Sequence, residues 1–131
     1  MELGHKSHRE SPIIHAIAET EKQVSVEIRV HISRRWWEPN ALKRAQRIFE
    51  RFGQSEKKTK GTILLYVNVH AKKFALVGQV NSTPPLSKRF WDKISNELIK
   101  NLRSTHYENA IALSVRYTGM QILLPDALST K

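Results

Sequence analysis

Hydrophobic and polar residues alternate strictly along residues 24–33 of the chain. Valine and isoleucine occupy the even positions from Val24 to Ile32, and serine, glutamate, arginine and histidine occupy the odd positions. A period of two is typical of a β-strand, because successive side chains point to opposite faces of a sheet. The alternation predicts a strand with one buried face and one face that is at least partly solvated.

Two further strands are predicted where β-branched and aromatic residues are concentrated. Residues 62–69 (TILLYVNV) are almost continuously apolar, as expected of a central strand covered on both faces. The next such stretch, Lys73–Val80, follows after a connection too short for a helical crossover. The two stretches are therefore predicted to form an antiparallel hairpin, although its turn (HAKK) lacks the favoured glycine.

Two helices are predicted in the first half of the chain. The first begins at Pro12 with Ser11 as its N-cap, and its apolar stripe continues to about residue 22. The second covers residues 40–52, with one apolar face and one strongly basic face. Gly53 is expected to end the second helix as its C′ residue.

Two more helices are predicted in the second half. The prolines at positions 84 and 85 are expected to open a long helix, because apolar residues then recur at helical spacing up to Leu102. Thr105 and Glu108 are expected to form a capping box for a last helix, which should end at Gly119. Whether residues 120–131 add an edge strand or an extended tail stays open.

The order of these elements predicts the fold class. Residues 24–33, 40–52 and 62–69 form a βαβ unit, so the first two strands should be parallel with a right-handed connection. Adding the antiparallel hairpin makes the sheet mixed. We predict an α/β fold, a three-layer α/β/α sandwich in which about four helices flank a small mixed sheet. Residues 11–131 should form a single domain, and the polar residues 1–10 a disordered tail.

Composition narrows the class of protein. The 131 residues suffice for one modest core, and the chain contains no cysteine. Disulfides, zinc–thiolate sites and a thiol nucleophile are therefore excluded. The first residues lack the pattern of a secretory signal, and no apolar run reaches the ~18 residues of a membrane-spanning helix. We expect a cytoplasmic protein with no transmembrane segment.

The formal net charge of +10 favours anionic partners in general. Lysine and arginine are scattered along the chain, and no RNA- or DNA-binding motif interleaves them with stacking aromatic residues. A solvated basic surface is therefore the favoured interpretation, and nucleic acid is an unfavoured partner. Binding of anionic lipid or nucleic acid remains an alternative, and it predicts an affinity that falls steeply with salt.

Several motifs follow one another along the chain, namely ETEKQVS with EIRVH, ALKRAQRIFERFG with Thr59-Lys60-Gly61, ILLYVNVHAKKFALVG, FWDKI and YENAIALSVRYTG. Their order resembles the TPM domain family, named for a thylakoid lumen phosphatase, a photosystem repair protein and a receptor modulator. The resemblance covers nearly the whole chain. It implies an α/β/α sandwich with a mixed sheet, and links to acid phosphatase activity, to calcium or magnesium binding and to the maintenance of membrane complexes.

A crevice beside the strand ends is the candidate site for such chemistry, because open α/β folds bind ligands there. Its candidate residues are Glu27, Gly78, Gln79, Asn81 and Ser82. Relatives usually carry an acidic residue where this chain has Gln79, and a calcium or magnesium site needs several carboxylates. We therefore predict no catalytic residue and no metal site. A weak divalent-metal-dependent acid phosphatase at this crevice is the alternative hypothesis.

Trp36 and Trp37 lie in the connection that precedes the basic helix. The favoured interpretation is that one or both cover the core. The alternative is an exposed contact site for a partner protein or a membrane interface. Its candidate residues are Arg34, Arg35, Trp36, Trp37, Lys43 and Arg47. Together these observations predict a non-enzymatic protein-interaction module whose partner, an unknown protein, acts in solution or near a membrane.

Overall fold

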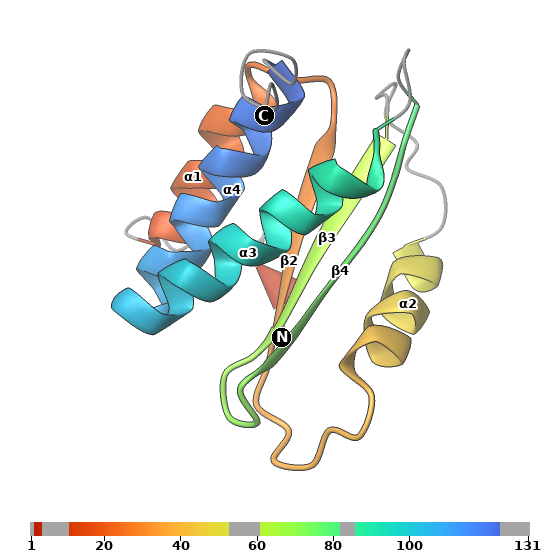
Figure 1. The fold of residues 1–131 in the computed structure, drawn as a ribbon, viewed down its shortest axis with the longest axis vertical. Coiled ribbons are helices and arrows are strands. Elements are labelled where there is room, and N and C mark those ends of the chain that lie inside the picture. Colours follow the sequence, from red (N-terminus) through yellow and green to blue (C-terminus); the bar gives the residue numbers. More distant parts are fainter. Residues whose placement is uncertain (1, 4–10, 53–60, 82–85, 124–131) are drawn as a thin grey trace. The chain divides into compact units, whose positions relative to one another are not determined.

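The computed structural model describes residues 2–3, 11–52, 61–81 and 86–123. This part of the chain contains four helices and a mixed sheet, which confirms the predicted α/β fold class (Figure 1). In chain order, the elements are β1 (Glu2–Leu3), α1 (Pro12–Glu21), β2 (Glu27–Ser33), α2 (Ala41–Phe52), β3 (Gly61–Asn68), β4 (Lys73–Val80), α3 (Lys88–Ser104) and α4 (Tyr107–Leu123).

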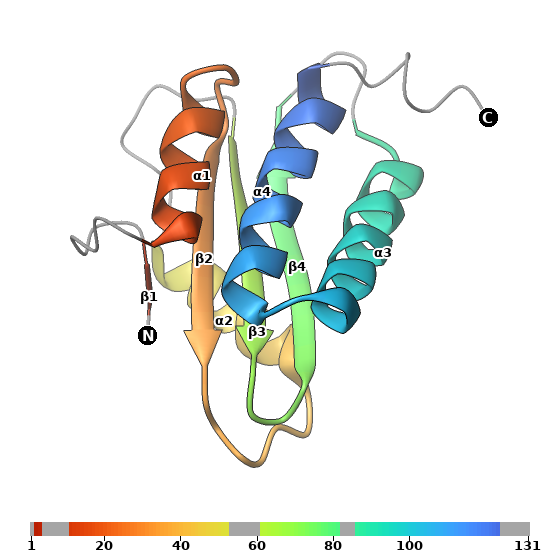
Figure 2. The same ribbon diagram turned by 90° about the vertical axis from the view of Figure 1, so that its left-hand side faces the viewer.

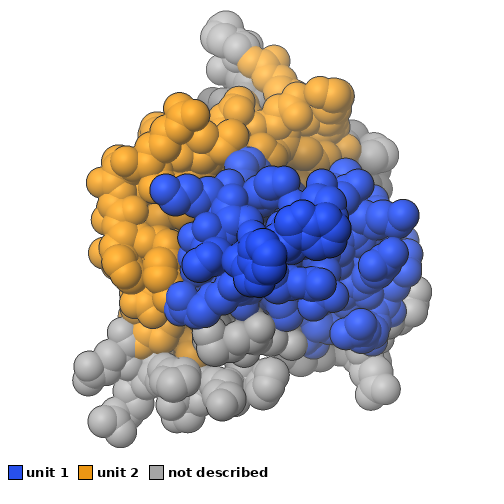
Figure 3. All heavy atoms as spheres, turned by 90° about the horizontal axis from the view of Figure 1, so that it is seen from below, with its two compact units in different colours: residues 1–6, 26–81 blue, residues 7–25, 82–131 orange. Residues whose placement is uncertain are grey.

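The chain divides into two compact units (Figure 3). Unit 1 comprises residues 1–6 and 26–81, and unit 2 comprises residues 7–25 and 82–131. The predicted single domain over residues 11–131 stays a prediction. Within the segment predicted as a disordered tail, Glu2–Leu3 form β1, and the other residues lie outside the described part of the chain.

Unit 1 contains the whole sheet, in the strand order β1-β2-β3-β4 (Figure 2). β2 and β3 run parallel, with Glu27 opposite Thr62, as expected of strands joined by a crossover helix. β3 and β4 run antiparallel, with Gly61 opposite Val80. The predicted βαβ unit and hairpin are therefore confirmed.

The alternation that predicted the first strand is visible only in the middle of its burial pattern, because Glu27 and Ser33 on the polar face are buried as well. Ile28, Val30 and Ile32 of β2 are buried, while Arg29 and His31 are only partly buried. The strand begins at Glu27, later than the predicted start, although Val24 and Val26 are buried as well. Residues 63–68 of β3 are all buried, which agrees with the predicted central strand.

α2 packs its apolar face against one side of the sheet (Figure 1). The residues of this core are Ala41, Ala45 and Ile48 from the helix and Leu64, Tyr66 and Ala75 from the strands. The Asn40 side chain caps the helix, because its Oδ1 accepts a hydrogen bond from the Lys43 amide at 3.0 Å. Gly53, predicted to end the helix, lies outside the described residues.

The β3–β4 turn closes without a glycine. Its Lys72 adopts a positive φ of 59°, a left-handed conformation that most residues avoid. The Asn68 side chain supports the turn, because its Oδ1 accepts hydrogen bonds from the amides of His70 and Ala71 at 3.0 and 2.9 Å. An Asx-type turn therefore takes the place of the favoured glycine.

Unit 2 consists of helices α1, α3 and α4, and α4 contacts both of the others. α1 and α4 approach closely at Gly119, where an added Cβ would lie 2.5 Å from the Thr20 methyl group. Between α3 and α4, the Asn101 side-chain amide donates to the Ser114 hydroxyl at 3.2 Å. Gly119 is thus a packing residue inside α4, and the prediction that it ends this helix is wrong because α4 continues to Leu123.

Two predicted helix starts are also corrected. α3 begins at Lys88, later than predicted, and the prolines at positions 84 and 85 lie outside the described residues. Ser87 is its N-cap, with its hydroxyl accepting from the Phe90 amide at 3.3 Å. The predicted capping box at Thr105 does not form, because Thr105 is the C-cap of α3. The His106 ring accepts from the Glu108 amide at 3.3 Å at the start of α4.

Candidate functional site

The connection between β2 and α2, residues 34–40, presents two large aromatic side chains to solvent. We call it the Trp loop. Trp36 is 79% exposed and Trp37 is 66% exposed. The interpretation that they cover the core is therefore wrong, and both indole rings are accessible to a partner. Two adjacent exposed tryptophans are unusual, since aromatic side chains gain most from leaving water.

The first half of the Trp loop is tied to the sheet. Ser33, the last residue of β2, accepts a hydrogen bond from the Arg35 amide through its hydroxyl at 3.3 Å. Its carbonyl accepts from the Val69 amide at 3.0 Å. The Asn68 side-chain amide donates to the Arg35 carbonyl at 2.9 Å. The backbone that leads into the two tryptophans is therefore fixed by β3 and by the residue that follows it.

The second half of the Trp loop is held by Glu38, which is only 6% exposed. Its carboxylate accepts hydrogen bonds from the Tyr66 hydroxyl and, at 2.9 Å, from the Asn68 amide. Its backbone carbonyl accepts from Lys73 Nζ at 2.6 Å. We call these four residues the Glu38 clasp. Both ends of the Trp loop are thus anchored in unit 1, while its two tryptophans project outward.

The electrostatics of the Glu38 clasp fix which group donates. Burial alone would raise the pKa of Glu38, but hydrogen bonds from Tyr66 and Asn68, with the nearby arginines, hold the pKa below 4.5. Burial, reinforced by the bond to Glu38, raises the pKa of Tyr66 above 10.0. At neutral pH, Glu38 is therefore a carboxylate and Tyr66 a neutral phenol that donates to it.

Within residues 34–47, which include the Trp loop and the first half of α2, the exposed charge is entirely positive. Glu38, the one acidic residue within residues 34–47, is buried in the clasp. The exposed charged residues of this segment are the four predicted for a partner surface, namely Arg34, Arg35, Lys43 and Arg47. The structure therefore places all six predicted partner-surface residues, including the two tryptophans, on exposed positions of one continuous segment.

The strand-end crevice differs sharply from the Trp loop. Glu27 lies opposite Thr62 of β3, which in turn lies opposite Gln79 of β4, so these three residues form one row across the sheet. Gly78 is half-buried, Gln79 and Asn81 are exposed, and Ser82 lies outside the described residues. The strand register thus places Glu27 and Gln79 in one row, and the predicted site at this place stays a prediction.

The Glu27 carboxylate is already occupied by its neighbours. It is 7% exposed, and its Oε2 lies 2.9 Å from Arg29 Nη2 and 3.1 Å from Arg29 Nε. Its Oε1 accepts from the Thr62 hydroxyl at 3.5 Å. Arg29 in turn stacks over the Phe52 ring, 4.2 Å from its centroid. The Glu27 carboxylate, the one acidic group among the described candidate residues of the crevice, is therefore neutralised by Arg29.

The described residues of the crevice do not fit the calcium or magnesium ion that the family resemblance implied. Such an ion needs several oxygen ligands, including carboxylates free to approach it. Across residues 11–52, 61–81 and 86–123, no three histidine, aspartate or glutamate side chains cluster as metal ligands would. Glu27 would have to leave Arg29 to bind a cation.

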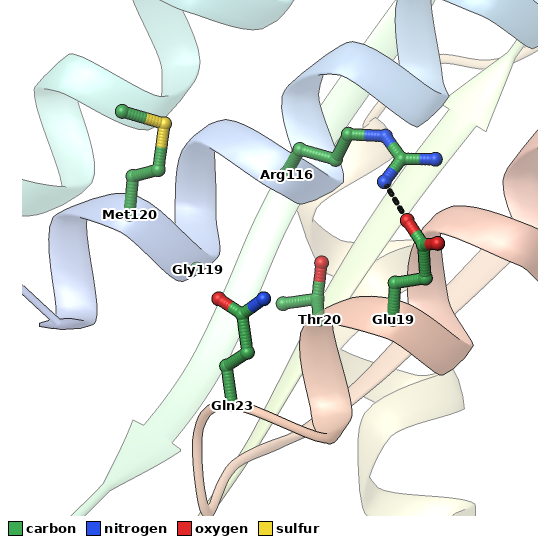
Figure 4. A pocket seen from close by; sticks show the side chains of 6 residues that line it. All are labelled: Glu19, Thr20, Gln23, Arg116, Gly119 and Met120. Carbon is green, nitrogen blue, oxygen red and sulfur yellow. Dashed lines mark hydrogen bonds and ion pairs between the residues drawn. The ribbon is translucent and has the colours of Figure 1, made fainter.

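A pocket of about 160 Å³ in unit 2 was not predicted from the sequence (Figure 4). It is lined by Glu19, Thr20, Gln23, Arg116, Gly119 and Met120. Arg116 Nη1 lies 2.5 Å from Glu19 Oε1 across its mouth, and this hydrogen bond lowers the pKa of Glu19. The two charges neutralise each other. The pocket therefore offers neither a free ionic ligand nor a paired acid and base.

Sequence reasoning also missed the Glu38 clasp. The one signal available was Asn68, a polar residue at the end of a strand that is otherwise almost entirely apolar. A buried amide needs hydrogen-bond partners, but the sequence does not indicate which ones. Those partners, Arg35 and Glu38, come from residues about thirty positions earlier in the chain.

The fold and the site together define a small α/β protein in which a loop exposes aromatic and basic side chains to solvent. The family model of the TPM domain matches residues 6–121, and the chain belongs to this family. This match confirms the resemblance found in the sequence. No helix in the described part of the chain is long and apolar enough to cross a membrane.

A solved structure supports the same assignment. The NMR structure of the BA42 protein from the psychrophilic bacterium Bizionia argentinensis superimposes on this chain with a TM-score of 0.73 and 28% sequence identity. The alignment covers 85% of this chain and 76% of that one. A search among curated proteins finds no match.

Proposed function

We propose that this TPM domain is a non-enzymatic protein-interaction module that binds its partner through the Trp loop. The observation that carries the proposal is the exposure of Trp36 and Trp37, 79% and 66% respectively. Tryptophan and arginine are the residue types most enriched among the hot spots of protein interfaces. The Trp loop combines two of each, Arg34 and Arg35 followed by Trp36 and Trp37.

The anchoring of the Trp loop supports this function. Binding costs conformational entropy when a loop must be ordered at the interface, and a loop that is already fixed avoids part of that cost. Here Asn68 holds the carbonyl before the tryptophans, and the Glu38 clasp holds the residue after them. The loop is thus organised for contact before a partner arrives.

Catalysis at the strand-end crevice has less support. A phosphatase needs a nucleophile or an activated water, together with a cation that stabilises the transferred phosphoryl group. Arg29 could serve as such a cation, but it is engaged by Glu27 and Phe52. Among the described residues of the crevice, no contact favours the binding of a phosphoester.

The proposal is tested by affinity capture from cell extract with three baits. They are the wild-type chain, the double variant Trp36→Ala/Trp37→Ala, and the control Leu113→Ala, which removes an exposed apolar side chain from α4. We expect at least one protein that the wild type and the control retain and the double variant loses. The purified pair should then bind at least ~10-fold more weakly with the double variant, because hot-spot truncations each cost about 2 kcal/mol.

Two results would overturn the proposal. One is that no captured protein depends on Trp36 and Trp37 when the three baits are compared quantitatively. The other is sustained phosphoester turnover that the double tryptophan variant keeps and Glu27→Ala abolishes. That second result would move the function to the strand-end crevice.

A further inference from the structure

We infer that the partner binds through an acidic segment that also carries apolar residues. When bound, this segment contacts the Trp loop and continues along α2. The inference rests on the proposed function and names the chemistry of its ligand. The surface concerned, called the basic–apolar strip, consists of Arg34, Arg35, Trp36, Trp37, Leu42, Lys43, Arg47 and Arg51.

Charge complementarity indicates the acidic character of this partner. Lys43, Arg47 and Arg51 follow one another at a spacing of four residues, so their side chains lie on one face of α2. All three are exposed, and none of them takes part in an ion pair with a described residue. Like charges at this spacing repel one another. Glu50, the one acidic residue of α2, is exposed on the same face and offsets part of that repulsion, but the face keeps a net positive charge that partner carboxylates would neutralise.

The start of α2 strengthens the preference for an anionic partner. The first turn of α2 contains no acidic residue and instead carries Lys43, which adds a positive charge near the positive end of the helix dipole. The Glu38 carboxylate does not balance this charge, because it accepts hydrogen bonds from Tyr66 and Asn68 in the clasp. A carboxylate placed at this end of the strip would meet the lysine and the helix dipole together.

Exposed apolar groups at one end of the strip indicate that the partner also supplies hydrophobic side chains. Leu42, the second residue of α2, is 49% exposed and follows shortly after Trp36 and Trp37. These three residues give apolar contacts, while the arginines and lysine give charge. A purely acidic polymer would leave the tryptophans in water, so an acidic segment with apolar residues fits better.

The line of cations favours a protein segment over a membrane. Residues 43 to 51 span about 12 Å along the helix axis, at 1.5 Å per residue. Figure 1 shows α2 leading away from the Trp loop, so the charges recede from the tryptophans along the helix. A bilayer that took up the two indoles at the Trp loop would leave these cations at increasing distances from its surface, where the attraction of anionic lipids falls off within a Debye length. An acidic helix or extended segment can follow the row instead.

The test uses the fluorescence of the Trp loop. Trp91, the third tryptophan, is half-buried on α3, so Trp91→Phe leaves Trp36 and Trp37 as reporters. The probe is a synthetic amphipathic peptide in which glutamate recurs every fourth residue beside leucine and phenylalanine. A matched peptide carries glutamine at each of those positions. Vesicles of phosphatidylcholine with phosphatidylserine and a single-stranded oligothymidine are the competing ligands.

We expect the acidic peptide to shift the tryptophan emission to the blue and the glutamine peptide to bind at least ~10-fold more weakly. The double variant Lys43→Gln/Arg47→Gln should bind the acidic peptide more weakly than the wild type by a similar factor. The control Arg89→Gln/Arg103→Gln removes two exposed charges from α3 and should leave binding unchanged. The control and the Lys43→Gln/Arg47→Gln variant each lose two positive charges, so their net charges are equal.

Several outcomes overturn the inference. They are equal binding of the two peptides, no binding of the acidic peptide, or a tryptophan blue shift only with vesicles or oligothymidine. The captured cellular partner separates this inference from the proposed function. If its binding requires Trp36 and Trp37 but survives Lys43→Gln/Arg47→Gln, the acidic inference fails alone. If no partner requires the tryptophans, the proposed function fails.

Discussion

Two buried glutamates lie at opposite ends of β2 and have different partners. Glu27 opens the strand, and its carboxylate is paired with Arg29, two residues away. Glu38 follows the other end of the strand, and its carboxylate accepts from Tyr66 and Asn68 on β3. The first contact is local and charged, whereas the second joins distant parts of unit 1 through neutral donors.

The difference explains why the Glu27 carboxylate is not available to a ligand, whereas the segment that contains Glu38 exposes two tryptophans. The arginine on Glu27 satisfies the carboxylate and leaves it little capacity for another cation. The neutral donors on Glu38 instead fix the backbone of the Trp loop, so the burial of one carboxylate keeps two indoles exposed. A buried carboxylate can thus be structural in either setting, and its partners decide what it positions.

The largest effect is expected from Glu38→Ala. This change leaves the buried Tyr66 hydroxyl and one Asn68 hydrogen without their acceptor, and it should lower the free energy of unfolding by about 3 kcal/mol. Urea denaturation followed by circular dichroism measures the loss. Glu38→Gln keeps an acceptor oxygen and should cost clearly less. Equal losses in the two variants would mean that the hydrogen bonds contribute little.

The Glu38 clasp should also make stability depend on pH. Because the folded-state pKa of Glu38 lies below 4.5, its contribution is fully present above that value and is lost as pH falls through the folded pKa. The stability advantage of wild type over Glu38→Gln should therefore shrink below about pH 4.5. Urea melts across this range check the sign. A gap that widens on acidification would contradict the assigned pKa direction.

A smaller loss is expected from Glu27→Ala, about 1–2 kcal/mol, because Arg29 can turn toward water when its partner is removed. Glu27→Gln should cost less, since the amide oxygen still accepts from Thr62. The same melts measure both variants. A loss from Glu27→Ala as large as that from Glu38→Ala would remove the distinction between the two ends of β2.

The smallest effect on stability is expected from Trp36→Ala/Trp37→Ala. Both side chains are exposed, so the free energy of unfolding should change by no more than about 0.5 kcal/mol. Partner binding, in contrast, should fall strongly. A large destabilisation would show that the indoles serve the fold, and the comparison with Glu38 would then lose its meaning.

Much of the fold was predictable because it follows local periodicity. The alternation around Ile28 and Val30 gave β2, and the apolar face containing Ala45 and Ile48 gave α2. Helix ends were harder to predict, because the sequence does not indicate which glycine is needed for packing. Glycine often ends a helix, but Gly119 lies inside α4, where the Thr20 methyl group leaves no room for a side chain.

The candidate site was only partly predictable. The sequence identified Trp36 and Trp37 as residues in a connection, but whether they are buried depends on hydrogen bonds from Asn68 and Tyr66, about thirty residues later. Such pairings depend on strand register, which periodicity does not specify for a distant side chain. The strand register places Glu27 and Gln79 in one row across the sheet, but the sequence did not indicate that Arg29 pairs with the Glu27 carboxylate.

Asn68 connects two surface segments through one side chain. Its amide nitrogen holds Arg35 and Glu38, while its oxygen accepts from the amides of His70 and Ala71 in the β3–β4 turn. Both segments lie at the same end of the sheet (Figures 1 and 2). A spin label attached at position 71 would therefore keep a fixed distance to the backbone of the Trp loop. A change in its distance to the indole rings would then report that a ligand has moved the tryptophan side chains.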